Sequence, residues 1–234
     1  MHRCLPACVL ALLGVALLAL SGCASSPPTR LYVVPSLTDT ATAPPLAPHD
    51  LTLGVGPVTL PPYLDRPQIV TRAGRARLVL AEFDQWAAPL QDTVARVLAE
   101  NLSLLIPTDR VLLSPWPRTM AIDYQVMVEV TQFERTMGGE VVLVARWRIA
   151  AADGQELMRR TARFSTPAGG QDYEATVTAM SRTLEALSRD MAATVQSLVQ
   201  QAPVQQAPAR EAYRSRNNAT REESAVELSP PGGS

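Results

Sequence analysis

The chain has 234 residues, a formal net charge of −1 and a hydrophobic share of 47%. This length suits one domain with tails, or at most two small domains, and the near-neutral charge excludes the basic surface that nucleic-acid binding requires. The chain holds 3 Cys and 2 His, which leaves almost no material for a metal centre or a His-assisted nucleophile. We therefore expect no enzymatic activity, no cofactor and no metal.

The N-terminus carries an export signal. Arg3 precedes an uncharged apolar stretch over residues 8–20, which is too short for a permanent transmembrane helix of roughly 20 residues and is typical of a signal peptide. The stretch ends in Leu20-Ser21-Gly22-Cys23, which resembles a bacterial lipobox. We therefore predict a signal peptide over residues 1–22 and lipid attachment at Cys23, because two or three acyl chains hold a domain durably on a membrane.

The alternative is an ordinary secretory signal with a chance cysteine. Against it, Cys23 falls at the predicted cleavage point, a Ser/Pro tether follows, and no other Cys remains in the mature chain. The disulfide framework common in exported domains is therefore absent. Ala24 stands where an Asp would favour retention in the inner membrane, so the predicted location is the periplasmic face of the outer membrane.

The first half of the mature chain mixes short strands with one helix. Gly54, Gly56 and Pro57 interrupt the alternation of one strand, which indicates an edge or a bend. Ala73-Gly74 predicts the turn of a hairpin, and Pro89 suits the first position of a helix that Pro107 ends. The predicted elements are a strand over 29–35, a Pro-rich linker over 36–50, strands over 51–60, 68–71 and 77–80, a helix over 89–106 and a strand over 111–113.

The second half predicts a three-stranded antiparallel meander over 124–135, 141–149 and 155–165, with a two-residue turn at Asp153-Gly154. A helix over 173–200 follows, whose apolar stripe packs either in its own core or as a seam for a partner helix, which leaves self-association open. The tail over 202–234 has the composition of a disordered segment. We expect one α+β domain over 51–201, joined by the strand over 29–35, with a mixed or antiparallel sheet and two main helices.

Four arginines alternate with the apolar residues of the meander and predict a solvated sheet face; they are Arg146, Arg148, Arg159 and Arg163. Glu82 and Asp84 lie two apart beside the predicted helix start, where acidic residues are ordinarily favourable. We therefore expect no catalytic pair of carboxylates there.

A distinctive string runs Leu60-Pro-Pro-Tyr-Leu-Asp-Arg-Pro-Gln-Ile-Val-Thr-Arg72, preceded by Gly-Val-Gly-Pro-Val and followed by Trp86-Ala-Ala-Pro-Leu90. Together these residues resemble the ABC-type transport auxiliary lipoprotein family, over roughly residues 32–199. The resemblance implies a non-enzymatic, outer-membrane-anchored lipoprotein. It would contact an MCE-type periplasmic subunit of a system that moves lipids or other hydrophobic molecules between the two membranes.

Six residues of this string are candidates for partner contact: Tyr63, Leu64, Asp65, Arg66, Arg72 and Trp86. Tyr and Trp are enriched at interfaces, and either arginine could hold a carboxylate in a bidentate fork. In the alternative interpretation, Tyr63, Leu64 and Trp86 pack under the loop while Asp65 caps a turn. A second function also stays open, that of a stand-alone envelope-integrity lipoprotein that binds peptidoglycan or another envelope protein.

Overall fold

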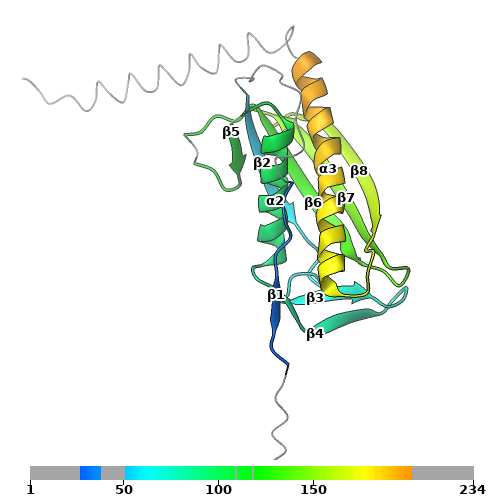
Figure 1. The fold of residues 1–234 in the computed structure, drawn as a ribbon. Coiled ribbons are helices and arrows are strands. Elements are labelled where there is room, and N and C mark those ends of the chain that lie inside the picture. The colour runs from blue at the N-terminus through cyan, green and yellow to red at the C-terminus, as the bar shows by residue number, and fades with distance from the viewer. Residues whose placement is uncertain (1–26, 38–50, 109, 118, 202–234) are drawn as a thin grey trace, which may run out of the picture.

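Three long strands and two helices form the body of the molecule (Figure 1). The computed structural model describes residues 27–37, 51–108, 110–117 and 119–201. The predicted signal peptide, Cys23, most of the Pro-rich linker and the C-terminal tail lie outside these residues. The elements are β1 (Arg30–Tyr32), β2 (Thr52–Thr59), β3 (Gln68–Arg72), β4 (Leu78–Trp86), α2 (Leu90–Leu105), β5 (Arg110–Leu113), β6 (Tyr124–Arg135), β7 (Glu140–Ala151), β8 (Glu156–Pro167) and α3 (Tyr173–Gln201).

The predicted meander is confirmed, because β6 pairs with β7 and β7 with β8, both antiparallel. Strict apolar alternation places Val126, Val128 and Trp147 on one buried face. The turn between β7 and β8 uses Gly154, whose φ of 86° lies in the left-handed region that glycine adopts without steric cost. Periodicity alone therefore specifies this half of the sheet.

The complete sheet is mixed and has 8 strands. β2 lies inside it, parallel to both β5 and β6, so the interruption at Gly54 to Pro57 does not mark an edge strand. It marks a bend instead, since the register with β6 shifts between Val55 and Val58. A strand buried on both faces explains the burial of successive residues in β2.

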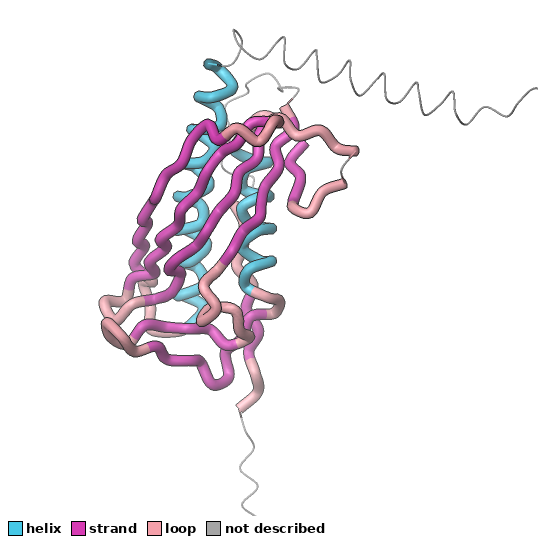
Figure 2. The backbone as a smooth tube through the Cα atoms, turned by 180° about the vertical axis from the view of Figure 1, so that it is seen from behind, coloured by secondary structure: helices cyan, strands magenta, loops and turns pink. Residues whose placement is uncertain are grey.

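α2 and α3 cover one face of the sheet, and both views show them side by side along it (Figures 1 and 2). The stripe of α3 packs in the domain's own core, so it is not a free seam for a partner helix. Its fully buried residues are Leu184, Leu187, Met191 and Val195. Among the described residues, no helix combines the length and the apolar character needed to cross a membrane.

Away from the end of β6, the opposite face of the meander is largely polar and exposed. Arg146 pairs with Glu129 at 3.3 Å, and Glu156 receives Arg159 at 2.6 Å and Arg148 at 3.7 Å. The four alternating arginines thus lie on a solvated sheet face, as their alternation with apolar residues predicts. Exposed pairs of this kind contribute little stability, with a median of about 0–1 kcal/mol.

β4 extends to Trp86, well beyond the short strand predicted over 77–80. Asp84 and Glu82 therefore lie in a strand rather than beside a helix start, which corrects the sequence interpretation of both. β4 pairs antiparallel with β3 and parallel with β1. These strands lie together at one end of the molecule, which is also where the described chain begins, whereas α3 ends at the opposite end (Figures 1 and 2). We name this the anchor end.

We name residues 30–37 the strap. It consists of β1 and the five residues after it, and these five residues contact both helices. Val34 is completely buried. The Ser181 hydroxyl of α3 donates to the Pro35 carbonyl at 2.7 Å, and the Leu37 N–H donates to Asn101 Oδ1 of α2 at 2.7 Å. The N-terminal segment is therefore an integral part of the fold.

Candidate partner-binding site

The loop over residues 60–67 connects β2 to β3 and holds the centre of the distinctive string. Pro61 and Pro62 fix the backbone φ, and their carbonyls accept hydrogen bonds from the N–H groups of Leu64 at 2.9 Å and Asp65 at 3.2 Å. This turn buries Leu64, which is 2% exposed, and leaves Asp65 exposed. Tyr63 is half-buried, and its hydroxyl reaches the end of β6.

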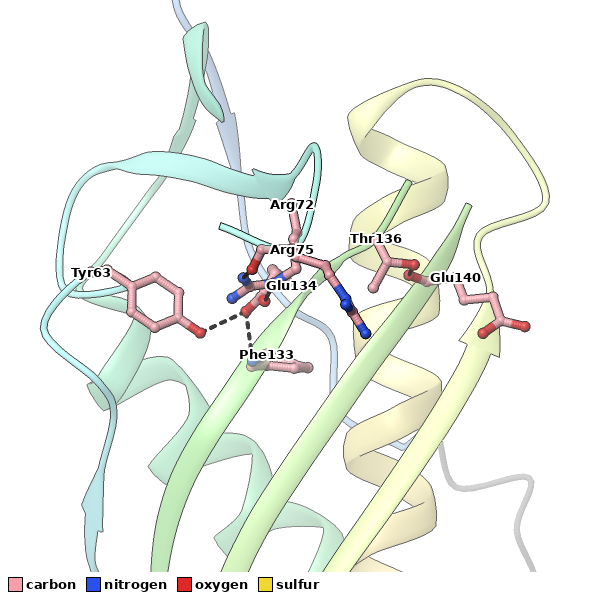
Figure 3. Close-up of polar contacts among 7 residues, drawn as sticks. All are labelled: Tyr63, Arg72, Arg75, Phe133, Glu134, Thr136 and Glu140. Carbon is pink, nitrogen blue, oxygen red and sulfur yellow. Dashed lines mark hydrogen bonds and ion pairs between the residues drawn. The ribbon is translucent and has the colours of Figure 1, made fainter. Parts of the chain in front are cut away.

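Tyr63 and Arg72 converge on Glu134, a completely buried carboxylate near the end of β6 (Figure 3). The Tyr63 hydroxyl donates to Oε2 at 2.9 Å and Arg72 Nε donates to Oε1 at 2.6 Å. The backbone N–H of Phe133 also donates to Oε2, at 3.1 Å. Arg72 therefore holds a carboxylate as the sequence suggests, but the carboxylate belongs to the protein itself.

The electrostatics of this cluster follow from its geometry. Burial, followed by the hydrogen bond to Glu134, raises the pKa of Tyr63 to about 12. The hydrogen bond to Glu134 also raises the pKa of Arg72. Tyr63 and Arg72 are consequently protonated at neutral pH, and together they satisfy a carboxylate that would be costly to bury alone.

A second cluster of the same composition joins the strap to β4. Arg30 forms two hydrogen bonds to Asp84, from Nε at 2.7 Å and from Nη2 at 2.8 Å, and the Tyr32 hydroxyl donates at 2.8 Å. Asp84 is 3% exposed, and the hydrogen bond from Arg30 is the main cause that lowers the pKa of its carboxyl. One cluster thus joins the strap to β4. The other joins the loop over 60–67 and β3 to β6.

The structure therefore divides the six candidate residues into two groups. Tyr63, Leu64 and Arg72 are turned toward the protein and position the loop. The other three line a shallow hollow of about 350 Å³ between the loop and the start of α2; they are Asp65, Arg66 and Trp86.

Within this hollow, Trp86 is 6% exposed, whereas Asp65 is exposed and Arg66 is half-buried. Arg66 Nε is buried and has no hydrogen-bond partner among the described residues. The rest of the half-buried Arg66 guanidinium, which also lines the hollow, suits a carboxylate or a backbone carbonyl of a binding partner. The hollow is therefore the part of the string that remains available for contact.

Glu134, Asp84 and their partners Arg30 and Tyr32 were not identified by sequence reasoning as members of a site. A signal was present for Glu134, because simple alternation from Tyr124 would place this acidic residue on the apolar face. The register shift between Val130 and Gln132 moves it to the other face, where β3 and the loop over 60–67 cover it. For Asp84 there was no comparable signal, since its partners lie more than 50 residues away.

The two acidic residues of β4, Glu82 and Asp84, have different surroundings. Asp84 binds Arg30 and Tyr32 while Glu82 is exposed, so these two carboxylates do not share a proton. Within the described part of the chain, no group of His, Cys, Asp and Glu side chains could hold a metal ion. The chemistry that the site offers is recognition through an indole, a guanidinium and a carboxylate.

A family model, two curated relatives and a solved structure are similar to this chain. The family model for the ABC-type transport auxiliary lipoprotein component matches residues 32–192. The intermembrane transport lipoproteins PqiC of Escherichia coli and Shigella flexneri are each 28% identical over 136 residues, which cover 58% of this chain and 71% of theirs. A crystal structure from Xanthomonas campestris has the same fold, with a TM-score of 0.63 and 17% identity over 74% of this chain and 98% of that one.

Proposed function

The chain belongs to the ABC-type transport auxiliary lipoprotein family, and on that premise we propose that it works at the periplasmic face of the outer membrane, held there by a lipid on Cys23. It acts as the auxiliary component of an ABC/MCE-type system that moves lipids or other hydrophobic molecules between the two membranes. Its contribution is contact with other proteins, chiefly the MCE-type periplasmic subunit, and not catalysis.

The observation that carries this proposal is the family match, which extends from the strap into α3. Two PqiC relatives, both named as intermembrane transport lipoproteins, also support a role in transport between membranes. The strap adds a physical argument, since a lipid on Cys23 would lie only seven residues before Arg30. Because Arg30 is fixed to Asp84, the anchor would hold the folded domain close to the membrane.

We propose the hollow beside Trp86 as the contact site for the periplasmic subunit. Asp65 and Arg66 offer one charge of each sign beside a buried aromatic ring, the composition that concentrates binding energy at protein interfaces. Tyr63 and Arg72 act indirectly, because their hydrogen bonds to Glu134 keep the loop in the conformation that forms the hollow.

Mass spectrometry of crosslinked partners from intact cells tests the function. We expect crosslinks to a periplasmic MCE-type subunit, and we expect Asp65→Arg and Arg66→Glu each to reduce them. The matched control is Arg182→Glu, which reverses an exposed charge on α3 outside the hollow. Melting temperatures of the variants separate loss of contact from loss of folding.

Two results would contradict the proposal. Crosslinks that are unaffected at Asp65 and Arg66 would remove the hollow as the contact site. Retention of the protein on purified cell-wall sacculi, with no transport subunit crosslinked, would favour the stand-alone envelope role instead.

A further inference from the structure

The tether between Cys23 and the folded domain is short. Pro27, where the described chain begins, is four positions after Cys23, so these two Cα atoms lie at most about 14 Å apart. Arg30 follows within a further distance of about 11 Å. The strap cannot lengthen the tether without breaking the Arg30–Asp84 ion pair and exposing Val34. A lipid on Cys23 therefore places the anchor end, and not the end of α3, against the membrane.

Large exposed apolar side chains gather at this same end. Leu31 and Val33 lie on the strap, at 64% and 56% exposed, and Val79 and Leu80 lie on β4, at 42% and 45%. Met137, at 74% the most exposed of all, lies in the turn after β6. That turn is beside the β3–β4 hairpin, because Thr71 of β3 pairs with Arg135, the last residue of β6.

The tip of the β3–β4 hairpin adds positive charge. Arg75 and Arg77 are exposed, and no ion pair involving either side chain is present among the described residues. Arg72, the third arginine of the tip, is occupied by Glu134. Glu82 is the exposed acidic residue on the same hairpin, so the two free arginines outnumber it. Arginine and apolar side chains side by side suit the boundary between phosphate headgroups and acyl chains.

We infer that the anchor end contacts the phospholipid surface directly, through a patch that we name the hairpin-tip surface. Its residues are Arg75, Arg77, Val79, Leu80 and Met137. The arginines bind lipid phosphates, and the apolar side chains enter the headgroup region. The inference rests on the lipid anchor of the proposed function and deepens it, since the domain would be oriented on the membrane as well as tethered to it.

Site-specific photo-crosslinking tests this orientation. The full chain is purified from cell membranes with a photoreactive residue at position 80 or at position 113 and reconstituted in vesicles of phosphatidylethanolamine with a minority of phosphatidylglycerol. Leu80 and Leu113 are matched, because they are 45% and 40% exposed but Leu113 lies in β5, outside the anchor end. We expect lipid adducts at position 80 to exceed those at position 113 severalfold.

Charge variants extend the test. Arg75→Gln together with Arg77→Gln is expected to reduce the adducts at position 80 severalfold, because each arginine near an anionic surface strengthens binding. Arg146→Gln with Arg148→Gln removes the same charge from the open sheet face and is expected to leave the adducts unchanged. Equal adducts at the two positions, or adducts at position 80 mainly to a second copy of this chain, would overturn the inference.

The intact mass of each preparation keeps the two proposals apart. A lipidated chain that gives no excess of lipid adducts at position 80 would overturn the oriented contact and leave the transport role standing. An unmodified mass would overturn both the lipid anchor and the inference that rests on it.

Discussion

The body of the molecule and its anchor end both bury apolar side chains, but the anchor end also buries two carboxylates. In the body, α3 packs an apolar stripe against β6, β7 and β8, and α2 packs one against β2 and β5. At the anchor end, the strap, the loop over 60–67 and β3 are fixed by Asp84 and Glu134, which are the buried carboxylates of the described chain. Apolar burial is non-directional and adds up over many residues, whereas each carboxylate cluster depends on three hydrogen bonds. We therefore expect the anchor end to open locally while the body stays folded.

The largest effect is expected in the body. Leu187 of α3 is completely buried, so Leu187→Ala leaves a cavity and should lower the free energy of global unfolding by about 2–5 kcal/mol. Chemical denaturation followed by circular dichroism measures this change. A loss below about 1 kcal/mol would show that the helix–sheet interface can collapse around the cavity, and would weaken the contrast between the two regions.

A smaller loss is expected from Glu134→Ala. The substitution leaves the Tyr63 hydroxyl and Arg72 Nε without their acceptor, which should cost about 1–3 kcal/mol. Hydrogen exchange should show faster exchange in the loop over 60–67 and in β3, with little change in α3. Uniformly faster exchange throughout the chain would mean that the anchor end and the body unfold as one unit.

Alkaline titration reports on Tyr63, through its burial and its hydrogen bond to Glu134. The pKa of Tyr63 is raised from 10.0 to about 12 in the folded protein. The corresponding stabilisation is fully present below pH 10 and is lost as the pH rises through about 12, because the unfolded chain ionises first. Tyr63→Phe should cost about 1 kcal/mol at neutral pH and remove this part of the alkaline dependence. An unchanged alkaline profile in Tyr63→Phe would assign the dependence to other groups.

The smallest effect is expected at the strap in acid. The folded pKa of Asp84 lies below its ordinary value of 3.8, so its stabilisation is present at neutral pH and is lost as the pH falls below 3.8 through the folded value. Hydrogen exchange of residues 30–37 should accelerate in that window. Asp84→Asn should remove this acid response, and Glu82→Gln, two residues away but exposed, should preserve it. A strap that responds to acid equally in both variants would contradict the role of Asp84.

The same contrast explains what sequence reasoning could establish. The meander and both helices were predictable because their apolar residues repeat with the period of one strand or helix, as in the stripe of α3 that includes Leu184 and Leu187. The α+β class follows from those elements, but they do not decide between a mixed and an antiparallel sheet. The long β4 was not predictable, because Glu82 and Asp84 break the apolar pattern and Asp84 is buried only through partners on a distant strand.

For the candidate site, the sequence identified the correct string but not the role of each residue. Tyr63 and Arg72 look equally suited to partner contact and to internal hydrogen bonds until Glu134 is placed beside them. The position of β2 inside the sheet was also not predictable, since parallel pairing with β5 and β6 depends on contacts between distant segments. Local pattern thus identifies elements, and long-range polar contacts determine which surfaces remain free.

The most direct test of this account is the intact mass of the protein recovered from fractionated cells. We predict a chain that begins at Cys23 and carries a diacylglyceryl group and an N-acyl chain, recovered with the outer-membrane fraction. An unmodified N-terminus on material found in the soluble periplasmic extract would contradict the claim that a lipid anchor holds this domain, through its strap, at the membrane.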